Sequence, residues 1–199
     1  KLTGKIGKWN LGVLGVDLED KGSLLADDVF AGRVTYDLFG ESTVGAIVTD
    51  GDPRGNGSAR TYGLDFHLKD SRFQGQEAKT GELIGWYMQT ENEGVEDYGW
   101  GLTAIYPNNP IYMRVGLQRV GEDLDPAMGF VRRPGIYEFT SFFSYETEPA
   151  GSRWNEIDFD FSAGFDADLD WEILSEEYEF DVTFERKGGG EIQFGIEHE

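Results

Sequence analysis

Apolar and polar residues alternate with a period of two along most of this chain. In residues 60–69 the side chains of Tyr62, Leu64 and Phe66 fall on one face, whereas Asp65 and His67 fall on the other. Successive side chains of a β-strand point to opposite faces of a sheet, so this window predicts a strand with one apolar and one polar face. The same alternation occurs in residues 29–38, 97–106, 111–119, 136–147, 156–165, 176–186 and 191–198.

The segments between these windows are rich in residues that form turns. Gly, Pro, Asn, Asp and Ser gather at residues 40–42, 50–57, 107–110, 148–151 and 187–190, as expected for connections between strands. Longer acidic connections are expected at 18–28, 50–58, 91–96 and 120–134. The windows lack the spacing of apolar residues that a helix needs. We therefore predict an all-β fold of about ten antiparallel strands, each about ten residues long and joined up and down.

Two environments would accept the apolar faces of such strands. In a soluble sandwich or barrel these faces pack inward on a shared core, whereas in an outer-membrane barrel they face lipid and the polar faces line the lumen. Aromatic residues dominate the apolar faces, and strands of about ten residues match a tilted membrane crossing. These features favour a membrane barrel, in which the lipid-facing aromatic residues would be Tyr62, Phe66, Trp100, Phe159, Phe161, Tyr178, Phe180 and Phe184.

The composition narrows the classes of function. The 199-residue chain carries 17 Lys and Arg against 38 Asp and Glu, a formal net charge of −21. This charge argues against a nucleic-acid partner, which would need a basic surface. The chain has no Cys, which excludes a disulfide framework and a thiol nucleophile. We expect the carboxylates to lie on polar faces and in loops, where they are solvated, attract cations or bind divalent ions.

Five stretches of the chain resemble a known barrel in their order and spacing. They are residues 1–14, 32–50, 70–75, 106–109 and 120–133, of which the last is the most specific. Together they resemble the barrel domain of a family of bacterial outer-membrane proteins. The long form of that family carries an amino-terminal domain similar to family-nine carbohydrate-binding modules. Asn109 departs from the family's pattern, which has Asp in this Tyr-Pro-Asn-Asp turn.

The resemblance implies a β-barrel of uncharacterised activity in the bacterial outer membrane. It also implies that residues 1–199 form a single barrel domain and are a fragment of a larger barrel, because the family's barrel continues further. We therefore expect a non-enzymatic scaffold or pore in the lipid bilayer, linked in the full-length protein to the binding of a glycan or the uptake of a small solute. Two alternatives stay open, a soluble carbohydrate-binding all-β protein and a membrane-embedded hydrolase.

The acidic 120–134 segment contains the candidate loop residues Asp125, Arg132 and Arg133. Pro126 fixes a turn and Gly129 permits a positive φ, so the segment is expected to fold back on itself. Arg132 and Arg133 either pair with carboxylates of the lumen and tie the loop down, or line a constriction that contacts an anionic solute or a sugar.

Groups suited to catalysis or to metal binding are few. The two His residues lack neighbouring ligands and no Gly-x-Ser-x-Gly motif occurs, so we name no catalytic residue and no required cofactor. Asp65 and His67 are expected to face the lumen. Asp50 and Asp52 begin a segment like a calcium loop, but Thr61 stands where an EF-hand has its bidentate acid. They are calcium candidates, with a hydrated turn as the alternative. The Trp residues expected either to stack on sugars or to meet lipid are Trp86, Trp100 and Trp154.

Overall fold

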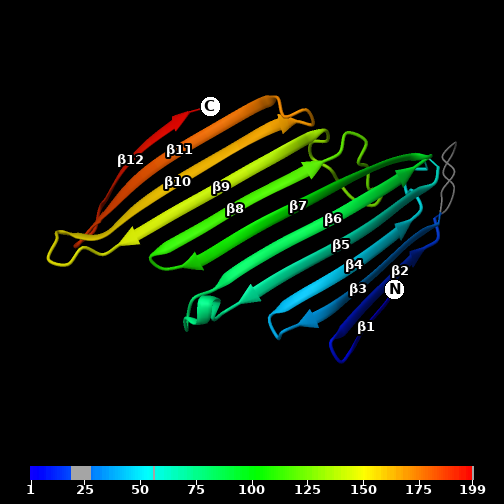
Figure 1. Ribbon diagram of the computed structural model, residues 1–199, viewed down its shortest axis with the longest axis horizontal. Coiled ribbons are helices and arrows are strands. Elements are labelled where there is room, and N and C mark those ends of the chain that lie inside the picture. The colour runs from blue at the N-terminus through cyan, green and yellow to red at the C-terminus, as the bar shows by residue number, and fades with distance from the viewer. Residues whose placement is uncertain (19–27, 56, 199) are drawn as a thin grey trace. The chain divides into compact units, whose positions relative to one another are not determined.

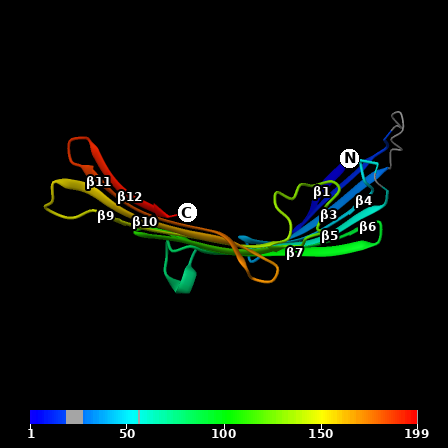
Figure 2. The ribbon, with the colours of Figure 1, turned by 90° about the horizontal axis from the view of Figure 1, so that it is seen from above.

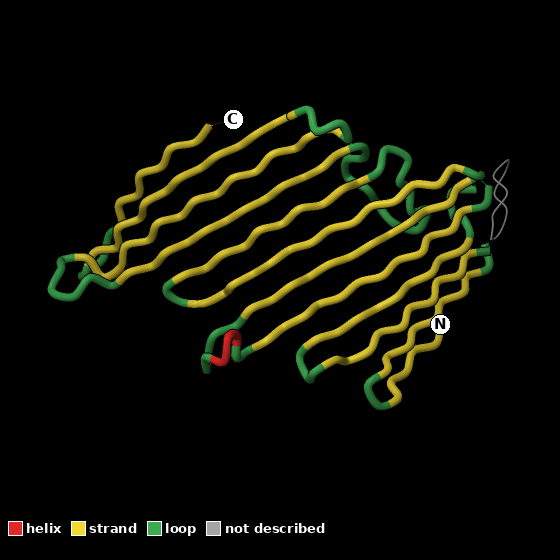
Figure 3. Tube along the Cα trace, viewed as in Figure 1, coloured by secondary structure: helices red, strands yellow, loops and turns green. Residues whose placement is uncertain are grey.

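The computed structural model of the protein describes residues 1–18, 28–55 and 57–198. Its strands are β1 (Leu2–Ile6), β2 (Trp9–Val16), β3 (Val29–Leu38), β4 (Ser42–Asp50), β5 (Ala59–Asp70), β6 (Gly81–Asn92), β7 (Val95–Asn108), β8 (Ile111–Val120), β9 (Ile136–Thr147), β10 (Trp154–Asp168), β11 (Ile173–Arg186) and β12 (Glu191–His198). A short 3₁₀ helix, η1 (Phe73–Gly75), lies between β5 and β6 and is red in Figure 3. Among the described residues, no helix has the length and apolarity needed to cross a membrane.

The twelve strands form one antiparallel sheet in which each strand is hydrogen-bonded to its neighbours in the chain (Figure 1). The prediction of an all-β, up-and-down fold is thereby confirmed. In the described residues the number of strands is twelve rather than about ten. The order runs from β1 to β12 and these strands are its two ends, so the sheet is not closed into a barrel.

The chain forms two compact units. Unit 1 comprises Lys1–Leu68, Ile84–Leu102 and Gln118–Ile136, and unit 2 comprises Lys69–Leu83, Thr103–Leu117 and Tyr137–Glu199. Unit 1 therefore holds β1 to β4, most of β5, the later part of β6, the first part of β7 and the end of β8. Unit 2 holds β9 to β12 almost entirely.

The register of β1 to β5 assigns each side chain of these strands to a face in unit 1. Leu64 pairs with Ala46, and Ala46 pairs with Val34. Val34 in turn pairs with Leu11. This row belongs to what we call the apolar face of unit 1. The residues between them in sequence form the polar face of unit 1, so the alternation in the sequence corresponds to the two faces of the sheet.

The register of β10 to β12 gives the same separation in unit 2. Phe161 pairs with Phe180, and Phe180 pairs with Ile196, on the apolar face of unit 2. Asp160 pairs with Asp181 on the other face, the polar face of unit 2. Carboxylates thus lie side by side across neighbouring strands in this unit.

Two of the expected acidic connections differ from the prediction or fall partly outside the structure. The predicted connection at 91–96 is a tight turn, because β6 continues to Asn92 and β7 begins at Val95. In the predicted connection at 18–28, residues 19–27 lie outside the described residues. The predicted 120–134 segment corresponds closely to the loop from 121 to 135 between β8 and β9.

The 121–135 loop rises from one face of the strands in Figure 2. It supplies part of a small buried cluster made of Val120, Leu124 and Ile136, against which Met88 and Val131 pack. Leu124 is 5% exposed. The apolar core of unit 1 therefore lies beneath this loop and not between two sheets.

Candidate functional site

Ion pairs connect strands across the polar face of unit 1. Lys5 Nζ lies 2.8 Å from Asp37 Oδ2, and Arg33 donates a hydrogen bond of 2.8 Å to Asp65 Oδ1. His67 lies on the same face of β5 as Asp65, opposite Thr43 of β4. The structure thus places Asp65 and His67 on a face with charged partners, and Asp65 is held by Arg33.

Large apolar side chains on the other face are exposed. Leu64 is 61% exposed, whereas its sequence neighbours Thr61 and Gly63 on the polar face are buried. In a soluble sheet the apolar face would be the buried one. In β5 the usual relation between polarity and burial is therefore reversed.

The aromatic residues expected to face lipid lie on the apolar faces of their own units. Exposed among them are Tyr62, Phe161, Tyr178 and Phe180, and partly buried are Phe66, Trp100, Phe159 and Phe184. Aromatic rings on neighbouring strands contact one another on these faces. The ring centroids of Tyr145 and Phe159, for example, lie 6.3 Å apart. The Phe66 ring lies over Gly85, which leaves no room for a side chain there.

Asp125 joins the 121–135 loop to the end of β6. Its backbone N–H donates to Thr90 Oγ1 at 3.3 Å, and its carbonyl oxygen accepts from Asn92 Nδ2 at 2.6 Å. The preceding turn of the loop is held in the same way, because the N–H of Asp123 donates to Asp97 Oδ2 at 2.9 Å. Side chains at the ends of β6 and β7 thus satisfy the backbone of the loop.

Arg54, from the loop between β4 and β5, binds the Asp125 carboxylate with two hydrogen bonds. Nη1 donates to Oδ1 at 2.9 Å and Nη2 donates to Oδ2 at 2.8 Å. The Arg54 Nε also donates to Asp52 Oδ1 at 2.9 Å. The hydrogen bonds that Arg54 donates to the carboxylate of Asp125 and, to a smaller extent, to that of Asp52 raise the pKa of its guanidinium above the usual value. This bidentate pair connects the β4–β5 loop to the β8–β9 loop, although Arg54 and Asp125 are 71 residues apart in the sequence.

Leu124 anchors the loop to the polar face of unit 1 through apolar contacts. A side-chain carbon added at Gly99 would lie 2.8 Å from Leu124 Cδ2 and 3.3 Å from Trp86 Cη2. Trp86 therefore lies on the polar-face side of β6 and β7, beside Gly99 and Gly101. The expectation that Trp86 faces lipid does not fit this position on the polar face, and the alternative that it stacks on a sugar stays a prediction.

The expectation that Arg132 and Arg133 pair with carboxylates of the lumen or contact a solute stays a prediction. Both are exposed and lie further along the 121–135 loop, whereas Arg54 provides the bidentate contact. Arg54, which the sequence analysis did not single out, thus ties this loop down through the Asp125 carboxylate. Sequence reasoning missed Arg54 because its partner is distant in the chain, and the one available signal was a single cation within the acidic 50–57 turn.

The calcium candidates Asp50 and Asp52 each accept hydrogen bonds from an arginine. Asp50 Oδ1 accepts from Arg60 Nε at 2.8 Å at the end of the β4–β5 pair. Asp52 is buried and accepts from the backbone N–H of Arg54 at 2.8 Å as well as from its side chain. The two carboxylates thus accept hydrogen bonds from two different arginine side chains, as carboxylates do where they stabilise a turn.

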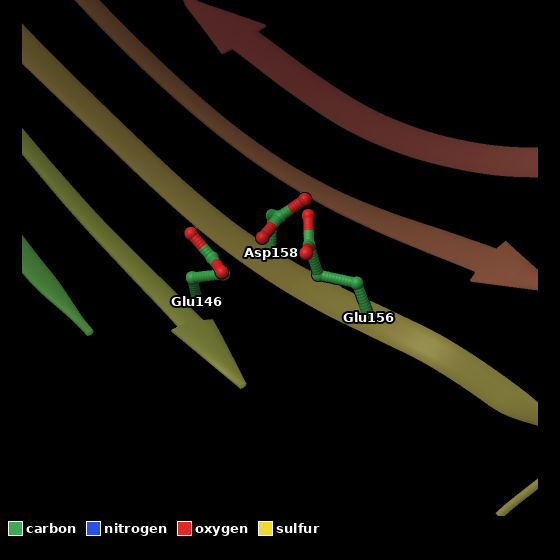
Figure 4. A group of neighbouring side chains, drawn as sticks. All are labelled: Glu146, Glu156 and Asp158. Atoms are coloured by element: carbon green, nitrogen blue, oxygen red, sulfur yellow. The ribbon is translucent and has the colours of Figure 1, made fainter. Parts of the chain in front are cut away.

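A second group of carboxylates lies on the polar face of unit 2. Glu146 of β9 and Glu156 and Asp158 of β10 point toward one another in Figure 4. One oxygen atom of each lies within 4.8 Å of the others, a spacing that would allow the three to share one cation. Sequence reasoning treated Asp158 as one of many paired acids, since alternation does not show that β9 brings Glu146 beside it.

Comparisons with protein-family models, with curated proteins and with solved structures found no match to this chain.

Proposed function

We propose that this chain is part of a β-barrel in the bacterial outer membrane and acts there as a scaffold or a pore. The observation that carries the proposal is the exposure of the apolar face in each unit. In unit 1 the exposed residues of this face include Trp9, Leu11, Val48, Tyr62 and Leu64, and in unit 2 they include Val115, Phe161, Phe180, Phe194 and Ile196. Exposed apolar side chains that share one face of a sheet are expected where that face contacts a membrane or another protein.

The lengths of the strands support a lipid environment for these faces. The strands from β3 to β11 have between 9 and 15 residues, compared with about 9–11 for a tilted membrane crossing. Soluble strands have about five or six. A lipid-facing surface also explains why polar residues such as Thr61 are the buried ones, because the polar face would then line a crowded interior.

The connections at the two ends of the strands in unit 1 support an orientation. The turns from β1 to β2 and from β3 to β4 have two and three residues, whereas at the other end the loops after β4 and β8 extend over 51–58 and 121–135, and only the β6–β7 turn between described strands there is short. Outer-membrane barrels have short periplasmic turns and longer extracellular loops. We therefore place the Arg54–Asp125 end of unit 1 on the outside of the cell.

The family resemblance extends the proposal to a role in glycan binding or solute uptake in the full-length protein. The polar faces are rich in carboxylates, which favours neutral or cationic solutes over anionic ones. The two ends of the sheet also need partners in a membrane, because unpaired strand edges in lipid leave N–H and C=O groups unsatisfied. Further strands of a larger barrel would provide them.

Flotation with lipid vesicles tests the proposal. The chain is refolded with phosphatidylcholine vesicles and centrifuged through a sucrose gradient, followed by an alkaline carbonate wash. We expect it to float with the vesicles, to resist the wash and to migrate differently on a denaturing gel before and after heating. A chain that stays folded and monomeric in buffer without detergent or lipid would refute the membrane assignment and favour a soluble carbohydrate-binding protein.

A further inference from the structure

The 121–135 loop covers part of the polar face of unit 1. Thr90, which receives the Asp125 N–H, is 1% exposed, and Met88 packs against the cluster of Val120, Leu124 and Ile136. These positions lie on the same side of β6 as Trp86. Removal of the loop would therefore uncover Met88 and Thr90.

Asp125 provides a polar attachment of the loop next to the buried apolar contacts of Leu124. Just after it, the N–H of Gly129 donates to the carbonyl oxygen of Pro126 at 2.7 Å, so that the chain turns back at once. The carboxylate of Asp125 is held by two hydrogen bonds from Arg54, which in turn is braced by the buried Asp52. A bidentate, charge-assisted contact is directional, and its loss cannot be compensated by a neighbouring residue without a similar geometry.

We propose that the Arg54–Asp125 pair is a latch that holds the 121–135 loop over β6 and β7, and that release of this latch opens the polar face of unit 1 to solutes. The second half of this inference rests on the proposed function, because only in a barrel does this face line a lumen. In that setting the latched loop narrows the lumen near its outer end.

Cysteine accessibility tests the latch without reference to a membrane. The chain has no Cys, so Met88→Cys introduces a single reporter under the loop. The rate of its modification by a charged methanethiosulfonate reagent is measured in the full chain with and without Arg54→Ala. We expect Arg54→Ala to raise the rate by roughly tenfold, which corresponds to about 1.4 kcal/mol in the opening equilibrium.

Arg60→Ala is the matched control for this measurement. Arg60 lies 2.8 Å from Asp50, a contact as short as that of Arg54 with Asp125, but its side chain belongs to the apolar face of β5. We expect no change in the modification rate. Thr90→Cys serves as a second reporter if Met88→Cys does not fold. An unchanged rate in Arg54→Ala, at a reporter that folds, would overturn the latch.

A reversible crosslink tests the effect of the loop on passage. Asp125 N lies 3.3 Å from Thr90 Oγ1, so the two positions are neighbours, and loss of free thiol confirms the disulfide between Thr90→Cys and Asp125→Cys before currents are recorded. In planar bilayers we expect this double variant to conduct less when oxidised than when reduced, and Arg54→Ala to conduct more than the wild type. Equal currents in the two redox states would overturn the gating role.

The two measurements separate this inference from the proposed function. If no variant carries current or floats with vesicles, the proposed membrane role fails, while the labelling rates still decide whether the latch exists. If the protein conducts but neither labelling nor current responds to Arg54→Ala, the latch fails and the proposed function stands.

Discussion

Replacing Leu64 with Arg tests which medium the apolar face of unit 1 meets. Leu64 is the sixth residue of the twelve-residue strand β5, with Ala46 of β4 as its register partner. Its 61% exposure means that the substitution loses few contacts within the protein. The cost of the charge therefore depends on whether lipid or water surrounds the side chain.

The two media predict different losses of unfolding free energy. At the lipid face of a membrane barrel, an Arg near the middle of the bilayer costs about 2–4 kcal/mol. At a surface in contact with water, a substitution of this kind changes stability by less than about 0.5 kcal/mol. Leu64→Ala removes the same packing without adding a charge, so the difference between Leu64→Arg and Leu64→Ala isolates the charge.

The assay is reversible denaturation in lipid vesicles followed by tryptophan fluorescence. Phe130→Arg is the second control, because Phe130 is 85% exposed but lies in the 121–135 loop and not in a strand. We expect a large loss for Leu64→Arg and almost none for Phe130→Arg. Equal stabilities of Leu64→Arg and Leu64→Ala, within about 0.5 kcal/mol, would refute the lipid contact.

Three further predictions address packing and charge. Gly99→Ala should destabilise the protein by about 1–3 kcal/mol in chemical denaturation, because the new carbon would lie 3.0 Å from the Arg119 carbonyl oxygen. Gly12→Ala is the control and should change stability little, because a side-chain carbon at Gly12 would have no atom within 4 Å. Equal effects of the two substitutions would contradict the packing. Arg54→Ala should cost about 1–2 kcal/mol, since it removes the side-chain hydrogen bonds to the Asp125 carboxylate and to the buried Asp52, and a denaturation midpoint like that of Arg60→Ala would contradict this. Asp158→Asn should stabilise the fold by about 0.2–1 kcal/mol at low salt by relieving repulsion from Glu146 and Glu156, and an equal gain in 1 M salt would show that charge is not the cause.

The alternation in the sequence identified most strands because each of these has one apolar and one polar face. It did so for β5, β10 and β11, where the register then put the predicted residues on one face. β6 gave no such signal, because Trp86 and Met88 occupy its polar-face side under the 121–135 loop while Tyr87 lies on the apolar face. Both faces of this strand are therefore apolar in part, and the period of two is lost.

The tie between Arg54 and Asp125 illustrates why the site could be predicted only in part. The sequence indicated that the 120–134 segment folds back on itself and singled out Asp125, Arg132 and Arg133 there, with a tie-down or a contact to a solute as the two alternatives. It gave no indication of Arg54 as the partner of Asp125, because the sheet and not the local sequence brings the β4–β5 loop beside the β8–β9 loop.

The sequence by itself determined that this protein is an antiparallel, up-and-down β-sheet with distinct apolar and polar faces, since side-chain alternation and turn residues are local properties of the chain. Only the tertiary structure decided which face is exposed, which carboxylates of β9 and β10 meet, and which arginine holds the 121–135 loop. These depend on register and on contacts between residues far apart in the chain, for which a single sequence carries no local signal.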